Sequence, residues 1–358
     1  MQRRADCDLA AFRFCGYSYP TAGKRRTICV RESGVLQGTP LLKRGFAGLA
    51  AGHDNDCGRI VRGADEPGIG FIGAGRVGVT LGAYLSARGR RVAGYVGRTA
   101  ASAEKAARLT GSVRFADYGE LIGKSDIVVV TTPDDSIGAV WERLAQCDVA
   151  GRMICHTSGS LSSEVFAGAA GRGAYAYSVH PMHAFTRKDG DTAGLEDIFF
   201  TVEGDGERLK DVCGLFTRCG NRVLVIGRGD KALYHLANVA VSNLVLALIS
   251  LGFDCFEKCG IDRESAMAAA APLIRANVDN ALNQGFLQAL TGPVERNDEG
   301  TVRAHAQVLF GELRRVYPLL SLRLAGLAQQ KYPGRDYEGL KGLLNGLARD
   351  TNEEVDSK

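Results

Sequence analysis

The sequence predicts an α/β domain with a mainly parallel sheet, followed by an all-α C-terminal domain. Within residues 67–229, short apolar segments alternate with segments of helical spacing, as in parallel strands joined by crossover helices. A glycine-rich turn follows the first strand. From residue 230 only segments of helical spacing follow. We therefore expect a Rossmann domain at 67–229, a helical substrate and dimerisation domain at 230–347, and a polar tail at 348–358.

The elements are predicted in order along the chain. Strands are expected where short apolar runs are bounded by polar or glycine residues, at 68–72, 92–96, 113–115, 126–131, 153–156, 174–180, 198–203 and 222–226. Helices of the first domain are expected where apolar residues lie three or four apart, at 76–88, 100–109, 134–144 and 206–219. The C-terminal helices are expected at 230–258, 263–284, 300–316 and 318–329.

Residues 1–66 differ from the rest of the chain. They show no sustained helical or strand period, so we expect a disordered extension. They also carry the whole net charge of +4, since residues 67–358 contain equal numbers of basic and acidic side chains. The folded part therefore gives no electrostatic reason to expect a nucleic-acid partner.

The cysteines and the apolar segments bear on location. The chain has ten cysteines but no Cys-x-x-Cys pair and no zinc-like spacing, so we expect no metal site and reduced thiols. The N-terminus lacks the apolar segment of a secretory signal. The longest apolar run, within 236–251, is interrupted by Asn238, Ser242 and Asn243, which argues against a membrane span. These features predict a cytoplasmic protein.

The glycine-rich turn has the spacing of a dinucleotide-binding loop. Gly73 permits the tight turn, Gly75 lets a pyrophosphate approach the backbone, and Gly78 lets the helix pack on the strand. The free N–H groups of the helix start would face the phosphates. The residues expected to bind the cofactor are Gly73, Ala74, Gly75, Arg76, Val77, Gly78, Arg98, Thr99, Thr132 and Pro133.

The end of the second strand favours NADP over NAD. NAD-binding domains usually carry an acidic residue there, which holds the ribose hydroxyls. This chain has Arg98 and Thr99 instead. A guanidinium can bind a 2′-phosphate through two hydrogen bonds, whereas a carboxylate would repel it. The alternative is that Arg98 is an ordinary surface residue.

Histidines follow two later strands, at the sheet edge where substrate would meet cofactor. They are His156, in the segment HTSG with Ser158, and His180 with His183, in the segment HPMH. A histidine at this edge can protonate a developing alkoxide or amine near neutral pH. The alternative is that each holds a loop by hydrogen bonds.

The helix that follows the last strand carries a polar stripe. Lys231, His235, Asn238 and Ser242 share one narrow face of a helix that is otherwise apolar and expected to be buried. Buried polar groups need partners, which a ligand or another helix could supply. We expect His235 to be the proton donor or acceptor, with His180 second. Weaker substrate candidates are His156, Ser158, Thr291 and Arg296.

Several segments together resemble a known family. They are GFIGAGRVG, TTPDD, HTSG, HPMHAF, YHLANVAVSN and ALTGPVERND, in order over residues 67–325. They resemble the Rossmann-like family called domain of unknown function 2520, which is similar to pyrroline-5-carboxylate reductase and the 6-phosphogluconate dehydrogenase superfamily. The resemblance implies an N-terminal NADP-binding domain and a C-terminal helical domain that commonly forms a dimer.

The resemblance has two departures. Related β-hydroxyacid dehydrogenases have a lysine and, four residues later, an asparagine, whereas here Lys231 is followed by His235. That change leaves the identity of the proton donor open. Asn297 stands where the family often has glycine, a change that a turn tolerates.

The leading hypothesis is an NADP-dependent oxidoreductase. It would act on a small polar carbonyl, imine or alcohol held between the two domains, with the nicotinamide supplying the hydride chemistry. A second hypothesis is a non-catalytic NADP(H)-binding sensor or assembly protein, because a fold does not establish chemistry. A third is a reductase that works with a deazaflavin or another redox carrier. We expect a homodimer formed through the C-terminal helices.

Overall fold

The computed structural model describes residues 66–187 and 189–356, and the predicted extension lies outside this part except for its last residue. The chain divides into two compact units, one ending at Leu236 and the other beginning at Ala237. The first turns of the helix that starts at Lys231 therefore belong with the sheet, although the predicted boundary lies before that helix.

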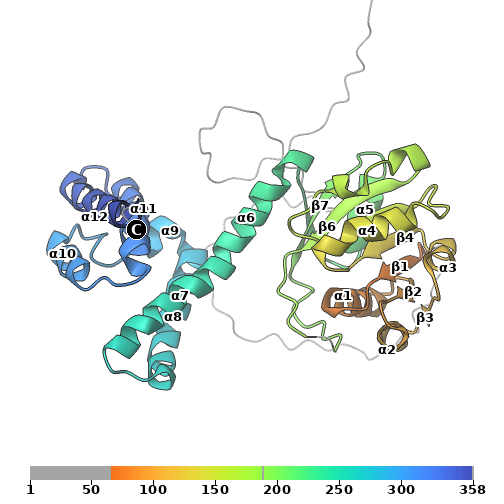
Figure 1. Cartoon of the computed structure of the whole chain (residues 1–358), viewed down its shortest axis with the longest axis horizontal. Helices are drawn as coiled ribbons and strands as arrows, with labels where there is room; N and C mark the ends of the chain where they lie inside the picture. Colours follow the sequence, from red (N-terminus) through yellow and green to blue (C-terminus); the bar gives the residue numbers. More distant parts are fainter. Residues whose placement is uncertain (1–65, 188, 357–358) are drawn as a thin grey trace, which may run out of the picture. The chain divides into compact units, whose positions relative to one another are not determined.

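The first unit is built on one eight-stranded sheet (Figure 1). The strands are β1 (Ile69–Ile72), β2 (Val92–Val96), β3 (Val113–Arg114), β4 (Ile127–Val130), β5 (Met153–His156), β6 (Tyr175–Pro181), β7 (Phe199–Gly204) and β8 (Arg222–Val225). Their order is β3-β2-β1-β4-β5-β6-β7-β8, and every neighbouring pair is parallel except β6 with β7. The predicted mainly parallel sheet is confirmed.

Helices cover both faces of this sheet. One core contains buried side chains of α1 (Arg76–Ala87), α2 (Ala100–Thr110) and α5 (Leu209–Thr217). The other contains side chains of α3 (Tyr118–Gly123), α4 (Asp134–Leu144) and the 3₁₀ helix η1 (Ser163–Phe166). The crossover helices account for these two layers, because a strand buried on both faces needs apolar cover on each side.

The strand register places a row of polar residues on the second face. His156 on β5 pairs with Ser178 on β6, which pairs with Glu203 on β7. His180, two residues after Ser178, pairs with Thr201. Paired residues of adjacent strands point to the same face of the sheet. This face is therefore apolar beneath α4 and polar near β7.

Between Ala237 and Asp356, the second unit has helices and no strand, beginning with the last residues of the helix that starts at Lys231. The others are α7 (Asn243–Lys258), α8 (Arg263–Gln284), α9 (Phe286–Ala289), α10 (Glu299–Gln307), α11 (Leu313–Lys331) and α12 (Glu338–Asp356). A core of buried side chains from α10, α11 and α12 includes Val302, Ala325 and Leu340. The helix α12 was not predicted, because its many polar residues obscure four buried or half-buried leucines, Leu340, Leu343, Leu344 and Leu347. Pro318 lies inside α11, so the predicted break there was wrong.

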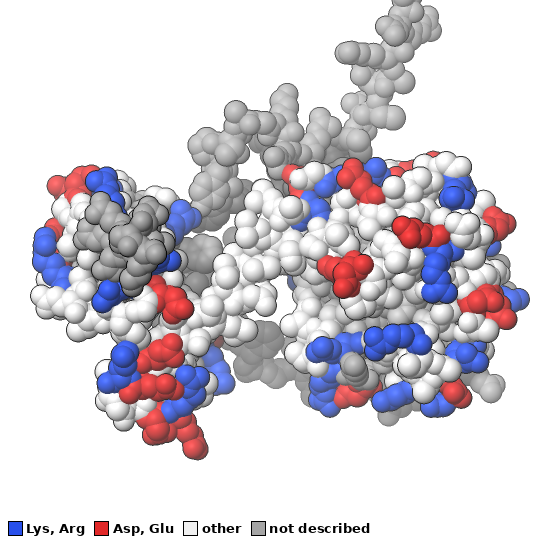
Figure 2. All heavy atoms as spheres, in the orientation of Figure 1, with Lys and Arg blue, Asp and Glu red and all other residues white. Residues whose placement is uncertain are grey.

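The apolar helix after the sheet is more exposed than predicted. It consists of α6 (Lys231–Val241) and α7, which are separated at Ser242. Leu233, Leu236 and Val241 are exposed by 57% or more, so the expectation of a buried helix was wrong within this chain. Figure 2 shows an uncharged surface along the middle of this segment, and the sequence has no charged residue between Lys231 and Asp254.

The length and composition of this segment also bear on the expectation of no membrane span. Residues 228–258 form one helical stretch that is long and apolar enough to cross a membrane, by length and composition alone. Core helices of soluble proteins can have the same length and composition, so the stretch does not by itself assign the chain to a membrane. The expectation of no membrane span therefore stays a prediction.

Candidate functional site

The glycine turn after β1 has the geometry that a dinucleotide needs. Gly73 has a φ of +111°, which favours glycine, and its N–H donates to the carbonyl of Val96 at 2.8 Å. A Cβ on Gly78 would lie 2.2 Å from the Gly73 carbonyl oxygen, so α1 can pack here only with glycine. A Cβ on Gly75 would meet nothing within 4 Å, which leaves open space at the start of α1. The turn therefore fits a bound pyrophosphate.

The end of β4 adds a second sign of a ligand. The Thr131 hydroxyl donates to the Gly73 carbonyl at 2.8 Å and ties β4 to the glycine turn. The next hydroxyl, on Thr132, is buried and has no hydrogen-bond partner within the described residues. Buried hydroxyls rarely stay unpaired, so a polar group of a cofactor is a suitable partner for it.

The ribose end of the expected site is exposed. Thr99 caps α2, because its hydroxyl accepts a hydrogen bond from the Ser102 N–H at 3.3 Å. Arg98, just before it, is exposed and so can reach a 2′-phosphate. The other predicted contacts line the same two turns: Ala74 and Val77 are half-buried, and Arg76 and Pro133 are exposed.

The loop after β5 is held by hydrogen bonds within the protein. His156 is fully buried, with Nδ1 accepting from the Ser158 N–H at 3.2 Å and Nε2 lying 3.1 Å from the Ser162 carbonyl. The Ser158 hydroxyl donates to Asp134 at 2.6 Å. As placed, His156 has no free ring nitrogen for a substrate, and its bonds fix the loop next to the cofactor turn.

A histidine, a tyrosine and a second histidine meet where β6 approaches α6. Nδ1 of His180 lies 2.7 Å from the hydroxyl of Tyr234. The position of a Cβ on Gly159 would be 3.0 Å from Nε2 of His180 and 2.7 Å from Nδ1 of His235. Both ring nitrogens therefore face the backbone of Gly159. Nδ1 of His235 is buried and lacks a hydrogen-bond partner within the described residues.

Lys231 lies deeper in the same cluster. It is 2% exposed, and its ammonium donates to the Ser178 hydroxyl at 2.6 Å. Burial lowers the pKa of Lys231 to about 8, against the opposing effect of the carboxylates of Glu203 and Asp134. Glu203 is fully buried and accepts hydrogen bonds from the N–H and hydroxyl of Ser163. The negative charges of these nearby carboxylates, together with the bond to Ser178, offset part of the cost of burying Lys231.

Burial keeps two histidines of the cluster uncharged at neutral pH. It lowers the pKa of His156 to about 4. It also lowers the pKa of His180 to about 4, where the positive charge of Lys231 and the neighbouring His235 add to the effect. A neutral imidazole has one donor and one acceptor nitrogen, so His180 can hand on a proton while staying neutral.

The structure brings together most but not all of the predicted residues. Lys231, His235 and His180 lie in one cluster of the first unit. Asn238 and Ser242 belong to the second unit, where the Ser242 hydroxyl donates to the Asn238 carbonyl at 2.6 Å. Their catalytic roles stay predictions.

Thr291 and Arg296 also lie in the second unit, and both are exposed. Between them and α10, Asn297 has a φ of 61° and donates to the Asp336 carbonyl at 2.9 Å. Asparagine tolerates this left-handed conformation better than most residues, which explains how it can stand in place of glycine. The predicted substrate contacts of this loop stay predictions.

Sequence reasoning missed Tyr234, Ser178 and Glu203. Tyr234 lies three residues after Lys231, so helical spacing could have found it. Ser178 lies two residues before His180 and so shares its strand face. Glu203 carries no such local sign, because it enters the cluster through the pairing of β7 with β6.

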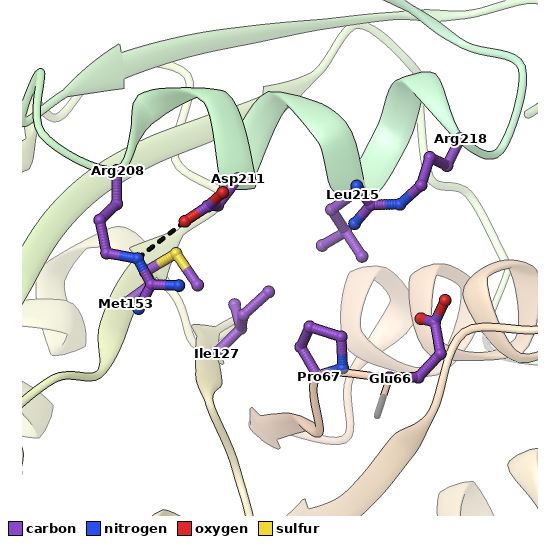
Figure 3. Close-up of a pocket in the computed structure, with 8 residues that line it drawn as sticks. All are labelled: Glu66, Pro67, Ile127, Met153, Arg208, Asp211, Leu215 and Arg218. Carbon is purple, nitrogen blue, oxygen red and sulfur yellow. Dashed lines mark hydrogen bonds and ion pairs between the residues drawn. The ribbon is translucent and has the colours of Figure 1, made fainter. Parts of the chain in front are cut away.

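One cavity lies at the opposite edge of the sheet. Figure 3 shows it at the amino ends of the strands, with Ile127 and Met153 on one side. Arg208, which is bonded to Asp211 at 2.8 Å, and Arg218 also line it. Dinucleotides bind at the carboxyl ends of parallel strands, so this cavity is not part of the candidate site. Within the described residues there is no group of three histidine, cysteine or acidic side chains that could hold a metal ion.

Solved structures resemble this chain in fold. A Thermotoga maritima protein is 26% identical with a TM-score of 0.59, over 74% of this chain and 99% of its own. A reductive aminase from Aspergillus terreus in complex with NADPH is 20% identical with a TM-score of 0.52, over 80% and 94%. A Plasmodium falciparum pyrroline carboxylate reductase with NADP bound is 16% identical with a TM-score of 0.50, over 75% and 98%. These likenesses confirm the type of fold.

Two family matches cover most of the described chain. Residues 57–181 match the Rossmann-like domain. Residues 198–324 match the family described as a domain of unknown function, DUF2520. No curated protein matches the chain. The chain therefore combines a Rossmann-like domain with a domain of the DUF2520 family.

Proposed function

We propose that this protein is an NADP-dependent oxidoreductase that reduces the C=N or C=O group of a small polar substrate, or runs the reverse oxidation. The observation that carries the proposal is the bond between His180 and Tyr234, which lies on the edge of the sheet that also holds the glycine turn. A hydride acceptor needs a proton donor beside it, and this pair can supply one.

The cofactor part of the proposal rests on the first unit alone. Gly75 leaves room for the pyrophosphate, Gly73 and Gly78 shape the turn around it, and the unpaired hydroxyl of Thr132 can bind a polar group of the cofactor. Arg98 and the absence of an acidic residue beside it favour the 2′-phosphate of NADP. When bound, the nicotinamide would supply or accept the hydride.

The protein's own contribution would be orientation and proton transfer. The missing Cβ of Gly159 lets His180 and His235 bring ring nitrogens close together, so one substrate nitrogen or oxygen beside them could bond to both. The buried ammonium of Lys231 would stabilise negative charge that develops on a substrate oxygen. The neutral ring of His180 and the positive charge of Lys231 suit an acceptor that becomes more electron-rich during reduction.

The test is turnover with defined probes. NADPH affinity would be measured by fluorescence, and NADPH oxidation at 340 nm would be followed with cyclic imines and with keto esters, the latter with and without a primary amine. We expect micromolar NADPH binding and oxidation that depends on at least one probe class. Tight NADPH binding with no turnover of any probe in either direction would favour the non-catalytic sensor.

His180→Asn supplies the matched control for chemistry. The substitution removes the proton carrier and leaves the glycine turn unchanged. We expect NADPH affinity within about twofold of the unaltered protein and turnover lower by about 100-fold. Equal turnover would remove His180 from the mechanism.

A further inference from the structure

We propose that the hydroxyl of Tyr234 is the source of the proton that His180 delivers to the substrate, and that Lys231 stabilises the tyrosinate left behind. The inference rests on the proposed function, but its first step is a property of the protein alone. It concerns three residues of one unit: His180 on β6 and, on the first turns of α6, Lys231 and Tyr234.

His180 carries no charge at neutral pH. Burial and the nearby ammonium of Lys231 keep its pKa low, so the ring is neutral at pH 7. A neutral imidazole that gave up its only N–H would become an imidazolate, a very strong base. His180 can therefore donate from Nε2 only if Nδ1 gains a proton in the same step.

The hydroxyl of Tyr234 meets this requirement. Its oxygen lies 2.7 Å from Nδ1 of His180, a normal length for a strong hydrogen bond. On the other side of the ring, Nε2 lies next to Gly159 and Nδ1 of His235, so a substrate within hydrogen-bond distance of Nε2 would receive its proton there. The ring thus connects the tyrosine to the substrate position.

Lys231 completes the arrangement. Its ammonium lies 5.4 Å from the centre of the Tyr234 ring, and its position is fixed by the bond to Ser178. The positive charge would attract the phenolate oxygen formed when the hydroxyl loses its proton. Because Lys231 is 2% exposed, solvent screens this attraction weakly.

The step balances in atoms and charge. The substrate carbon receives the hydride, and its nitrogen or oxygen receives the Nε2 proton of His180. Nδ1 then takes the proton of Tyr234, which leaves a phenolate and a neutral histidine. After product leaves, a solvent proton enters at Nε2 of His180 while Nδ1 returns its proton to the phenolate, which restores both side chains, so the net consumption is one hydride and one proton.

The first experiment needs no substrate. Long-range ¹H–¹⁵N NMR on the full chain labelled with ¹⁵N-histidine distinguishes the two neutral tautomers, and His180→Asn identifies the His180 signals. We expect the Nε2–H tautomer at pH 7, with Nδ1 accepting from Tyr234. The Nδ1–H tautomer would overturn the relay, because the histidine would then donate to the tyrosine.

The second experiment uses Tyr234→Phe. The ring keeps its edge contact with His180, at 5.6 Å between centroids, and loses only the hydroxyl. With NADPH and an imine or keto ester that the unaltered protein turns over, we expect kcat to fall by about 100-fold while the NADPH affinity holds. Tyr175→Phe is the control. Tyr175 lies on β6, as His180 does, and its hydroxyl donates to Glu207 at the surface, so its loss should change kcat by less than about twofold.

The pH profile separates a relay from a packing role. Without the tyrosine hydroxyl, only the imidazolium form of His180 can donate, so activity of the variant should rise up to about tenfold per pH unit as pH falls from 7 toward 5. The unaltered protein should lack this rise. The charged and titratable groups facing His180 are Lys231, His235, Asp134 and His156, and all stay in the variant.

The outcomes are distinguishable. Unchanged kcat in Tyr234→Phe, or a profile parallel to that of the unaltered protein, would overturn the relay. Absence of turnover in the unaltered protein with NADPH bound would instead overturn the proposed function, whichever tautomer His180 adopts.

Discussion

The α-carbon of Gly78 faces the carbonyl oxygen of Gly73 so closely that a Cβ would lie 2.2 Å from that oxygen. The same Cβ would lie 2.5 Å from the hydroxyl of Thr131. The contact locks the first turn of α1 onto the end of β1 and β4. At Gly75, three residues earlier, a Cβ would meet no protein atom within 4 Å. Gly78 is therefore needed for the packing of α1, whereas Gly75 leaves space for a ligand.

Replacing each glycine by alanine tests this separation. Gly78→Ala should lower the free energy of unfolding by about 1–3 kcal/mol, because α1 must move away from the turn. Gly75→Ala should cost less than about 1 kcal/mol and yet weaken NADPH binding by at least about tenfold, because the methyl group occupies the space of the phosphates. Urea unfolding without cofactor and NADPH fluorescence are the measurements. Normal NADPH affinity in Gly75→Ala would show that the pyrophosphate does not bind at this turn.

Arg98 should determine the choice between NADPH and NADH. Arg98→Ala should weaken NADPH binding by about 10–100-fold, the strength of one or two charge-assisted hydrogen bonds, and leave NADH binding within about twofold. Calorimetry with both cofactors is the measurement. Arg108→Ala, an exposed arginine at the far end of α2, is the control. Equal affinities for both cofactors in the unaltered protein would contradict the predicted preference.

The first domain could be predicted because its signals are local. Each buried strand is a short apolar run, and the predicted helix at 134–144 coincides with α4, Asp134–Leu144. The second unit was harder, because its boundaries depend on packing between helices. In α12 the charged residues outnumber the apolar ones, and only the contacts of Leu340 and Leu344 with the core explain why it folds.

The candidate site could be predicted only in part, for a related reason. Histidines at strand ends and a lysine on the following helix are visible in the sequence. Their partners are not, because β7 returns antiparallel to β6 after a long loop, and the register that sets Glu203 opposite Ser178 has no local signal. Two-residue spacing within β6 and three-residue spacing within α6 would have identified Ser178 and Tyr234.

The stability of the protein should fall in mild acid. The pKa of His156 is lowered from 6.5 to about 4, so the unfolded chain binds a proton in this pH range that the folded chain does not. The contribution of His156 to the free energy of unfolding is therefore fully present above pH 6.5 and is lost as pH falls toward 4. From pH 7.5 to 4.5, the stability advantage of the unaltered protein over His156→Gln should shrink by about 2–3 kcal/mol.

Urea unfolding at several pH values measures this difference. Comparing the two proteins removes the acid sensitivity that comes from carboxylates, which both share. His183→Gln, a change at an exposed histidine, is the control and should run parallel to the unaltered protein. A constant difference between the unaltered protein and His156→Gln would contradict the burial argument.

The exposed apolar side chains of the second unit predict an interface with another protein chain. On α7, Leu246 is 67% exposed, and on α8, Leu273 and Leu282 are 64% and 76% exposed. Large apolar side chains exposed in this number on neighbouring helices often mark an interface, and most soluble oligomers are homodimers. We therefore expect the chain to form a homodimer through α7 and α8.

Charged substitutions on these helices should weaken that dimer. Leu246→Glu and Leu282→Glu would each bury a charge in the interface, which should raise the dimer dissociation constant by at least about tenfold. Leu109→Glu, at a 48% exposed leucine on α2, is the matched control and should leave the dimer intact. Light scattering at micromolar concentration gives the mass. A monomeric mass for the unaltered protein would refute the dimer. Co-flotation of that monomer with lipid vesicles would instead assign the apolar surface of 228–258 to a membrane.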